Sequence, residues 1–201
     1  MKTTVNEIET EKNLRETRLS SEQIVDGHLM KAWRDNVRLP NGKTAIREYI
    51  RHPGAAIMIP LFANGDTILV KQFRYPVGKV FIELPAGKLD GNEPLKEAAQ
   101  RELAEEVGFT SDTLTLIAEF YPCIGYSNEK MWLFLAEDLK EASATADHDE
   151  FLEPIRVPFK DATAMVRRGK IDDMKTIAAI LLAESFIEQR QKGGGDGKVL
   201  S

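Results

Sequence analysis

The sequence predicts an α/β/α sandwich with a mixed sheet, preceded by a small N-terminal antiparallel β-sheet domain. Apolar runs at residues 55–63 and 67–73 flank a turn at 64–66 and are typical of buried strands. Further strands are expected at 113–121 and 130–137, and helices at 94–107, 161–168 and 173–189. The last helix is expected to bury Ile177, Ile180, Leu181 and Phe186.

The N-terminal sheet is expected from three segments that precede His52. Apolar and polar residues alternate along 17–25 and 28–39 in the way that indicates strands. Pro40-Asn41-Gly42-Lys43 predicts a hairpin turn into a third strand at 44–50. Three strands alone cannot bury a core. We therefore expect this sheet to pack on the main domain or on a second subunit.

Composition and chain length predict one main domain with a small addition. The 201 residues are 42% hydrophobic, which suffices for a substantial core. We expect a flexible N-terminus at 1–12, a dimerisation sheet at 13–51, a catalytic domain at 52–190 and a flexible tail at 191–201.

Charge and hydropathy exclude several classes of function. The net charge of −5 argues against nonspecific binding to a nucleic acid polymer, which needs a basic patch. The first twenty residues lack the apolar core of a signal peptide, and residues 55–63 are too short a run to span a bilayer. Cys123 has no partner for an intrachain disulfide and is interpreted as an ordinary thiol. We expect a cytoplasmic protein with no membrane partner.

The segment at 87–109, GKLDGNEPLKEAAQRELAEEVGF, carries most of the functional information. Pro94 suits a first helical position, and no Pro or Gly follows before Gly108, which is expected to end the helix. The apolar side of this helix is expected to comprise Leu95, Ala98, Ala99, Leu103 and Val107.

Three glutamates converge on the other side of the same helix. Residues three and four apart share a face, so Glu102, Glu105 and Glu106 repel one another unless a cation lies among them. Oxygen ligands without nearby His or Cys select Mg²⁺ or Mn²⁺, and Mg²⁺ commonly binds substrate phosphate. The alternative is a solvated helix face with an incidental ion pair such as Glu97 with Arg101.

The whole segment resembles the Nudix box, G-x5-E-x7-R-E-U-x-E-E-x-G-U with U apolar, at every fixed position. The resemblance implies hydrolysis of a nucleoside diphosphate linked to another group, with two or three divalent ions. It implies that Glu102, Glu105 and Glu106 are metal ligands together with the Ala86 carbonyl, that Glu105 also serves catalysis, and that Arg101 orients a glutamate. Glu93 is expected either near the metals or at the first helical turn.

The flanking sequence resembles ADP-ribose pyrophosphatases and related nucleoside diphosphate sugar hydrolases over about residues 37–185. The runs that carry the resemblance are HPGAAIMIP at 52–60, ILVKQFRYPVGKVFIELPAGKLDGNE at 68–93 and FYPCIGYSNEKMWLFLAEDL at 120–139. Relatives usually have Ser-Pro-Gly after the box, whereas this chain has Cys123-Ile124-Gly125. The base and sugar therefore stay open, with ADP-ribose and GDP-mannose as candidates.

Several further residues are expected to act on the substrate. Arg51 and Arg74 lie beside predicted strand ends, and a guanidinium suits a diphosphate. The resemblance implies that Glu83 and Glu129 contact sugar or metal, and that Glu150 or Glu153, in an acidic loop, is the general base. Trp33 is a candidate for base stacking. The alternatives are surface ion pairs for the arginines, a merely solubilising acidic loop and a core position for Trp33.

Related proteins use such an N-terminal sheet to form a domain-swapped homodimer whose subunits share the active site, and we expect the same here. A monomer that folds the sheet onto itself is the alternative. Two other functions stay open: a nucleoside triphosphate pyrophosphatase, and a noncatalytic nucleotide sensor. Sensors typically lose glutamates of the box, whereas this chain keeps all four.

Overall fold

The computed structural model describes residues 13–143 and 151–193. The chain divides into two compact units, which are considered separately. The first is Met1–His52 with Cys123–Glu129, and the second is Pro53–Pro122 with Lys130–Ser201.

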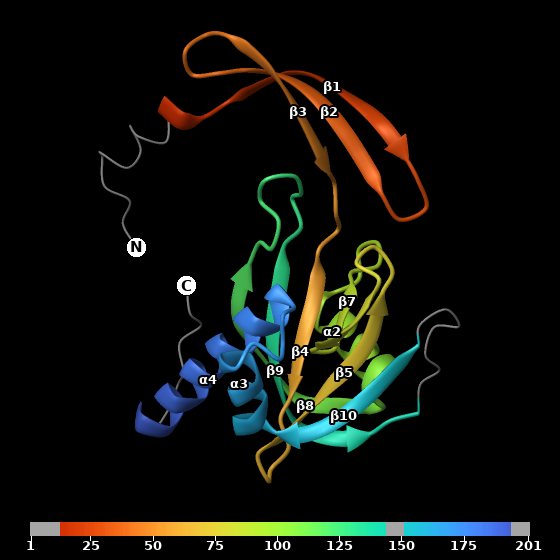
Figure 1. Cartoon of the computed structure of the whole chain (residues 1–201), viewed down its shortest axis with the longest axis vertical. Coiled ribbons are helices and arrows are strands. Elements are labelled where there is room, and N and C mark those ends of the chain that lie inside the picture. The colour runs from red at the N-terminus through yellow and green to blue at the C-terminus, as the bar shows by residue number, and fades with distance from the viewer. Residues whose placement is uncertain (1–12, 144–150, 194–201) are drawn as a thin grey trace. The chain divides into compact units, whose positions relative to one another are not determined.

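The first unit is an antiparallel sheet of β1 (Thr17–Asp26), β2 (Lys31–Arg38) and β3 (Thr44–Ile50), in that order (Figure 1). The hairpin between β2 and β3 is confirmed, and Gly42 has the positive φ of 83° that its turn requires. β2 begins at Lys31 rather than at His28, because Gly27 donates its N–H to the Met30 carbonyl at 3.0 Å and closes a turn there.

The second unit contains two sheets, of order β7-β4-β9-β8 and β10-β5-β6. The strands are β4 (Ala55–Pro60), β5 (Asp66–Arg74), β6 (Lys79–Glu83), β7 (Ala86–Lys88), β8 (Phe109–Phe120), β9 (Met131–Glu141) and β10 (Leu152–Pro158). The helices are α2 (Leu95–Val107), α3 (Phe159–Arg167) and α4 (Met174–Gly193). β4 and β9 pair in parallel and the other pairs are antiparallel, so the predicted mixed sheet is confirmed. β6 and β7 were not expected from the sequence.

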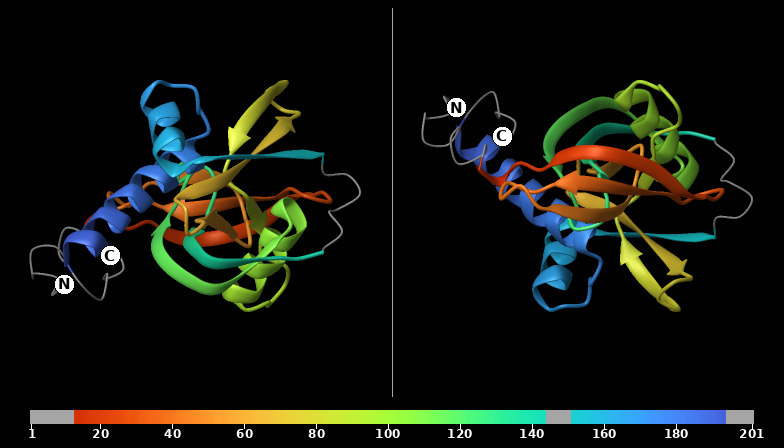
Figure 2. Two further views of the ribbon diagram at one scale, coloured as in Figure 1. Left: turned by 90° about the horizontal axis from the view of Figure 1, so that it is seen from below. Right: turned by 90° about the horizontal axis from the view of Figure 1, so that it is seen from above.

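The alternation of side chains along β4 explains why helices cover both faces of the sheet. Ile57 and Ile59 pack into a core formed with α3 and α4, whereas Met58 packs into a second core formed with α2. Every residue of β4 is buried, as expected for a strand that is covered on both sides. Each such Ile side chain contributes roughly 1.5–3 kcal/mol of transfer free energy. The α/β/α sandwich is thus confirmed, and Figure 2 shows α2 opposite the α3–α4 pair.

Helix α2 begins one position later than expected. Pro94 is its N-cap, with an extended backbone, and its carbonyl accepts the N–H groups of Glu97 at 2.8 Å and Ala98 at 3.1 Å. The helix ends at Gly108, whose φ of 74° lies in the left-handed region. The expected apolar side is confirmed, with Ala98, Ala99, Leu103 and Val107 buried and Leu95 packed against the same core.

Helix α4 packs largely through the predicted side: Ile180 and Phe186 are buried and Ile177 packs against the same core, but Leu181 does not. Its buried residues are Thr176, Ala179, Ile180, Ala183 and Phe186, whereas Leu181 is 40% exposed. The two small alanines allow the helix to lie close to the sheet on the side of Ile180, which turns Leu181 towards the edge. None of the described helices is long and apolar enough to cross a membrane.

Candidate active site

The site is built where the short strand β7 meets helix α2. β7 pairs with β4, and the backbone of Gly87 lies directly against the side chain of Glu102. A Cβ atom on Gly87 would lie 1.8 Å from the carboxyl carbon of Glu102. The absence of a side chain at Gly87 therefore allows this carboxylate to lie on the β7 backbone.

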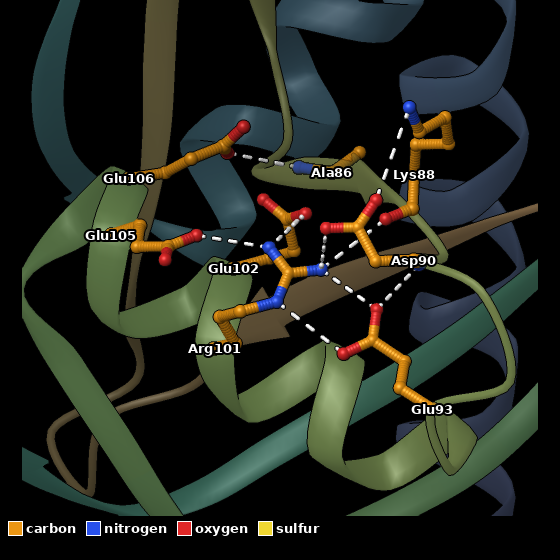
Figure 3. A network of polar contacts seen from close by, with 8 residues as sticks. All are labelled: Ala86, Lys88, Asp90, Glu93, Arg101, Glu102, Glu105 and Glu106. Carbon is orange, nitrogen blue, oxygen red and sulfur yellow. Dashed lines mark hydrogen bonds and ion pairs between the residues drawn. The ribbon is translucent and has the colours of Figure 1, made fainter. Parts of the chain in front are cut away.

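Arg101 lies at the centre of the carboxylates (Figure 3). Its Nη1 donates to Glu102 Oε1 at 2.8 Å and to Glu105 Oε2 at 3.0 Å. Its Nη2 donates to Glu93 Oε1 at 2.8 Å and to the Lys88 carbonyl at 3.3 Å. The hydrogen bond with Glu93 and the charge of Glu102 raise the pKa of Arg101 despite partial burial. One permanent cation thus offsets the mutual repulsion of several glutamates.

Glu93 holds the loop before α2 rather than the first helical turn. Its Oε1 accepts the Asp90 N–H at 2.7 Å as well as the Arg101 guanidinium. The hydrogen bond from Arg101 and that from the Asp90 amide lower the pKa of Glu93. The Glu97 and Ala98 amides bond to the Pro94 carbonyl, and no side-chain hydrogen bond caps the helix, so Glu93 does not serve as a hydrogen-bonding cap of α2.

Glu106 connects the end of α2 to the start of β7. Its side chain is largely buried, and its Oε2 accepts the Ala86 N–H at 3.0 Å. Ala86 and Glu106 are both ligands implied by the family resemblance, so this contact places two of the expected ligands beside each other. Figure 3 shows Glu102, Glu105 and Glu106 on the side of α2 that faces β7.

The atoms that could bind a metal at this site suit a hard divalent ion. They are carboxylate oxygens and a backbone carbonyl, the ligand types that Mg²⁺ and Mn²⁺ prefer. Within residues 13–143 and 151–193, no three acidic, His or Cys side chains already surround one point closely enough to hold an ion. Glu102 and Glu105 are both turned towards the same nitrogen of Arg101. An ion bound here would share these carboxylates with the guanidinium.

Arg74 and Glu83 form a pair in the second unit. The Arg74 Nε and Nη2 donate to the two oxygens of Glu83 at 2.8 and 2.7 Å, and Lys175 of α4 contacts the same carboxylate. Burial raises the pKa of Glu83, but Arg74 and Lys175 outweigh it, so the pKa lies below its usual value. Two residues that were expected to contact substrate are thus held against each other.

Three other candidates lie in the first unit. The Arg51 guanidinium carbon lies 3.4 Å from the centroid of the Trp33 ring, and its Nη2 donates to the Tyr49 hydroxyl at 3.0 Å. A base that stacked on this face of Trp33 would have to displace Arg51. Glu129 lies 3.7 Å from Nδ1 of His52, and both side chains are mostly buried.

The expected general bases are placed only in part. Glu150 lies outside the described residues. Glu153 belongs to β10, its side chain is 68% exposed, and Lys71 of the neighbouring strand β5 reaches it at 2.7 Å.

Sequence reasoning missed three polar residues at the start of α4, namely Asp173, Lys175 and Thr176. Asp173 accepts the Thr176 N–H at 3.0 Å, and Lys175 reaches Glu83. An Asp directly before an apolar helical stripe is a helix-start signal, so the capping role could have been found from the sequence. The contact with Glu83 could not, because it joins residues far apart in the chain.

Comparison with known protein families identifies the chain. Residues 51–180 match the family model of the NUDIX domain, and residues 16–50 match that of the nucleoside diphosphate sugar hydrolase N-terminal domain. The chain belongs to the Nudix family. The family recognised from the box is thereby confirmed, and the chain is a Nudix hydrolase.

Relatives of this Nudix chain carry several names. The ADP-ribose pyrophosphatase of Bacillus subtilis is 40% identical over 171 residues, which is 84% of this chain and 92% of that protein. The methanol dehydrogenase activator of Bacillus methanolicus is 36% identical over 82% of this chain and 90% of that protein. The GDP-mannose pyrophosphatase of Yersinia enterocolitica is 35% identical over 69% of this chain and 78% of that protein.

A solved structure described as an ADP compounds hydrolase superposes with a TM-score of 0.79. The match covers 90% of this chain and 97% of that one at 24% sequence identity. It shows that the two proteins share the Nudix fold.

The close approach of Gly87 to Glu102 in the Nudix box predicts the effect of Gly87→Ala. The new Cβ would displace the Glu102 carboxylate, which is the mobile end of a long side chain, so the fold should survive while divalent-ion binding weakens. Titration calorimetry with Mn²⁺ measures this. The matched control is Gly193→Ala, where the new methyl group meets no atom of the described residues within 4 Å outside its own turn of helix. Equal Mn²⁺ affinity in Gly87→Ala and wild type would contradict the arrangement.

The ion pairs of Glu83 predict how stability depends on pH. Because the folded-state pKa of Glu83 lies below its ordinary value of 4.5, the carboxylate stabilises the folded state above that pH. Its contribution is lost as the pH falls through the lowered pKa. The free energy of unfolding in urea should therefore decline less steeply in acid for Glu83→Gln than for wild type. Glu97→Gln, at an exposed position, serves as control. If the free energy of unfolding changed equally with pH in wild type, Glu83→Gln and Glu97→Gln, the ion pairs of Glu83 would not contribute as stated.

Proposed function

We propose that this protein hydrolyses the pyrophosphate bond of nucleoside diphosphate sugars with the help of Mg²⁺ or Mn²⁺. The observation that carries the proposal is the gathering of three glutamates beside β7, with Glu102 and Glu105 on Arg101 and Glu106 on the Ala86 N–H. Nudix hydrolases generally use divalent metal ions. The relatives named as ADP-ribose and GDP-mannose pyrophosphatases support the substrate class.

Within this class, two substrates are favoured. ADP-ribose would give AMP and ribose 5-phosphate, and GDP-mannose would give GMP and mannose 1-phosphate. The relative with 40% identity favours ADP-ribose. The Cys123-Ile124-Gly125 loop replaces the usual Ser-Pro-Gly run and favours a broader or different preference.

Glu102, Glu105, Glu106 and the Ala86 carbonyl would hold two or three ions. Bound there, the ions would neutralise charge on the phosphate oxygens and activate a water molecule. The contact of Arg101 with Glu93 would keep the guanidinium beside the site while the carboxylates hold the ions.

Water would attack one phosphorus, break the P–O–P bridge and release a nucleoside monophosphate and a sugar phosphate. We propose Glu150 or Glu153 as the base that takes the proton of that water, with Glu105 as a further catalytic carboxylate. Glu153 would first have to leave Lys71. A charge-assisted contact between exposed groups is weak enough for this exchange.

Five other residues are proposed to bind the substrate. Arg74 would meet the diphosphate with its orientation maintained by Glu83, and Arg51 would leave the Trp33 ring to do so. Glu83 and Glu129 would accept hydrogen bonds from sugar hydroxyls, and Trp33 would offer an aromatic surface to the base.

A substrate panel tests the activity. With Mg²⁺ present, coupling to a phosphatase should reveal phosphate release from ADP-ribose, GDP-mannose or UDP-glucose. Glu106→Gln should lower turnover by orders of magnitude with an unchanged circular dichroism spectrum, because a ligand that acts in the transition state is lost. Glu97→Gln, on the same helix but exposed, is the control.

The outcomes of this panel separate the alternatives. Nucleoside triphosphates complete the panel, coupled to an inorganic pyrophosphatase because a phosphatase attacks them directly. Release from them alone would favour a triphosphate pyrophosphatase. If no compound of the panel is hydrolysed, the proposed hydrolysis is refuted and a noncatalytic nucleotide sensor is favoured. A Glu106→Gln variant with wild-type turnover would show that the ion site is misassigned.

We also propose a domain-swapped homodimer built through the N-terminal sheet. Apolar side chains of the first unit are exposed, including Leu29 at 71% and Ile46 at 58%. Three strands do not bury a core by themselves, so a second copy is the expected cover.

Sedimentation equilibrium tests the dimer. The mass should be twice the 22.6 kDa of the chain. Ile46→Asp should shift the protein towards monomer, because it places a charge in the proposed interface. Val77→Asp, at a similarly exposed apolar position of the second unit, should not. A monomeric wild-type protein at micromolar concentration would contradict the proposal.

A further inference from the structure

The first turn of α4 holds the segment that joins β6 to β7. This segment begins at Glu83, a proposed substrate contact, and ends at Ala86, whose carbonyl is a proposed metal ligand. Several of its bonds reach other elements of the sandwich. The Met58 N–H donates to the Pro85 carbonyl at 2.9 Å, the Ala86 N–H donates to Glu106, and Arg74 of β5 donates to Glu83. Further bonds come from α4.

Thr176 connects the helix to the middle of this segment. Its Oγ1 accepts the Leu84 N–H at 2.9 Å and donates to Asp173 Oδ2 at 2.6 Å. Thr176 and Leu84 are both buried, at 0% and 1% exposure. A hydroxyl has one proton, so its donation to Asp173 leaves a lone pair for the Leu84 amide. Asp173 in turn is fixed by capping α4 through the Thr176 N–H.

Lys175 connects the same turn to the start of the segment. Its ammonium group contacts the Glu83 carboxylate and lies 2.9 Å from Asp173 Oδ2. The Lys175 side chain is 11% exposed and that of Glu83 is 2% exposed. A buried charge is tolerated only when it is paired, so neither group can leave its partner cheaply. The carboxylate is therefore held from α4 as well as from Arg74.

We propose that Asp173, Lys175 and Thr176 are positioning residues of the hydrolytic site. By holding Glu83 and Leu84, they set the position of the Ala86 carbonyl at the other end of the segment. The kinetic part of this inference rests on the proposed function, whereas the ion-binding part does not. A misplacement of about 1 Å at a reacting group can cost about 100-fold in rate, so a small shift of this segment suffices.

Thr176→Val and Thr176→Ser test the proposal as a matched pair. Valine keeps the shape of threonine and removes the hydroxyl, whereas serine keeps the hydroxyl. Thr176→Val should weaken Mn²⁺ binding in titration calorimetry by about tenfold or more. For the preferred substrate of the panel, the factor by which kcat falls should be larger than the factor by which KM changes. Thr176→Ser should restore both quantities to wild-type values.

Each other outcome has a definite meaning. Thr176→Val with wild-type Mn²⁺ affinity and kcat, or Thr176→Ser as impaired as Thr176→Val, would overturn the proposal. Wild-type protein that binds Mn²⁺ but hydrolyses no compound would refute the proposed function, and the calorimetry would still test positioning. Wild-type protein that binds no Mn²⁺ would overturn both.

A second variant provides the test if Thr176→Val does not fold. Lys175→Met keeps the length of the side chain and removes the ammonium group from Glu83. It should weaken Mn²⁺ binding by about tenfold, as expected when a residue that orients a ligand is lost. Wild-type affinity in Lys175→Met would then overturn the proposal.

Discussion

The guanidinium of Arg101 compensates a group of carboxylates that could not otherwise share one side of a helix. It contacts Glu93, Glu102 and Glu105 directly, and Glu102 is largely buried against the backbone of Gly87. Carboxylates brought together in a region of reduced water access repel one another strongly. The same charge density that requires Arg101 makes the site suitable for divalent ions, so structure and proposed function depend on one electrostatic constraint.

The sandwich maintains this constraint from two sides. The core beneath α2 fixes the helix through Ala99 and Leu103, and the opposite core fixes α4, whose first turn holds Leu84. β4 contributes to both cores because its side chains alternate between the faces of the sheet. Displacement of either helix would alter the spacing between the glutamates of α2 and the backbone of β7.

The elements that local pattern specifies were predicted well, and those that depend on distant contacts were not. Helix α2 was found because its apolar spacing, Pro94 and Gly108 agree with one another. The short strand β7 was missed, since its three residues pair with β4 and carry little pattern of their own. Leu181 was assigned to the core by its hydropathy, although the packing of Ala179 and Ala183 directs it outward.

The sequence by itself determined the family, the helix of the box and the oxygen ligands available for an ion, because these follow from residue types at fixed local spacing. Tertiary structure decided how the charges are compensated. It directed Arg101 to several glutamates, paired Arg74 with Glu83 and brought Lys175 and Thr176 of α4 to the segment before β7. The contacts of Lys175 and Thr176 join residues 92 positions apart in the chain, and only the packing of the helices over the two cores places them within hydrogen-bonding distance.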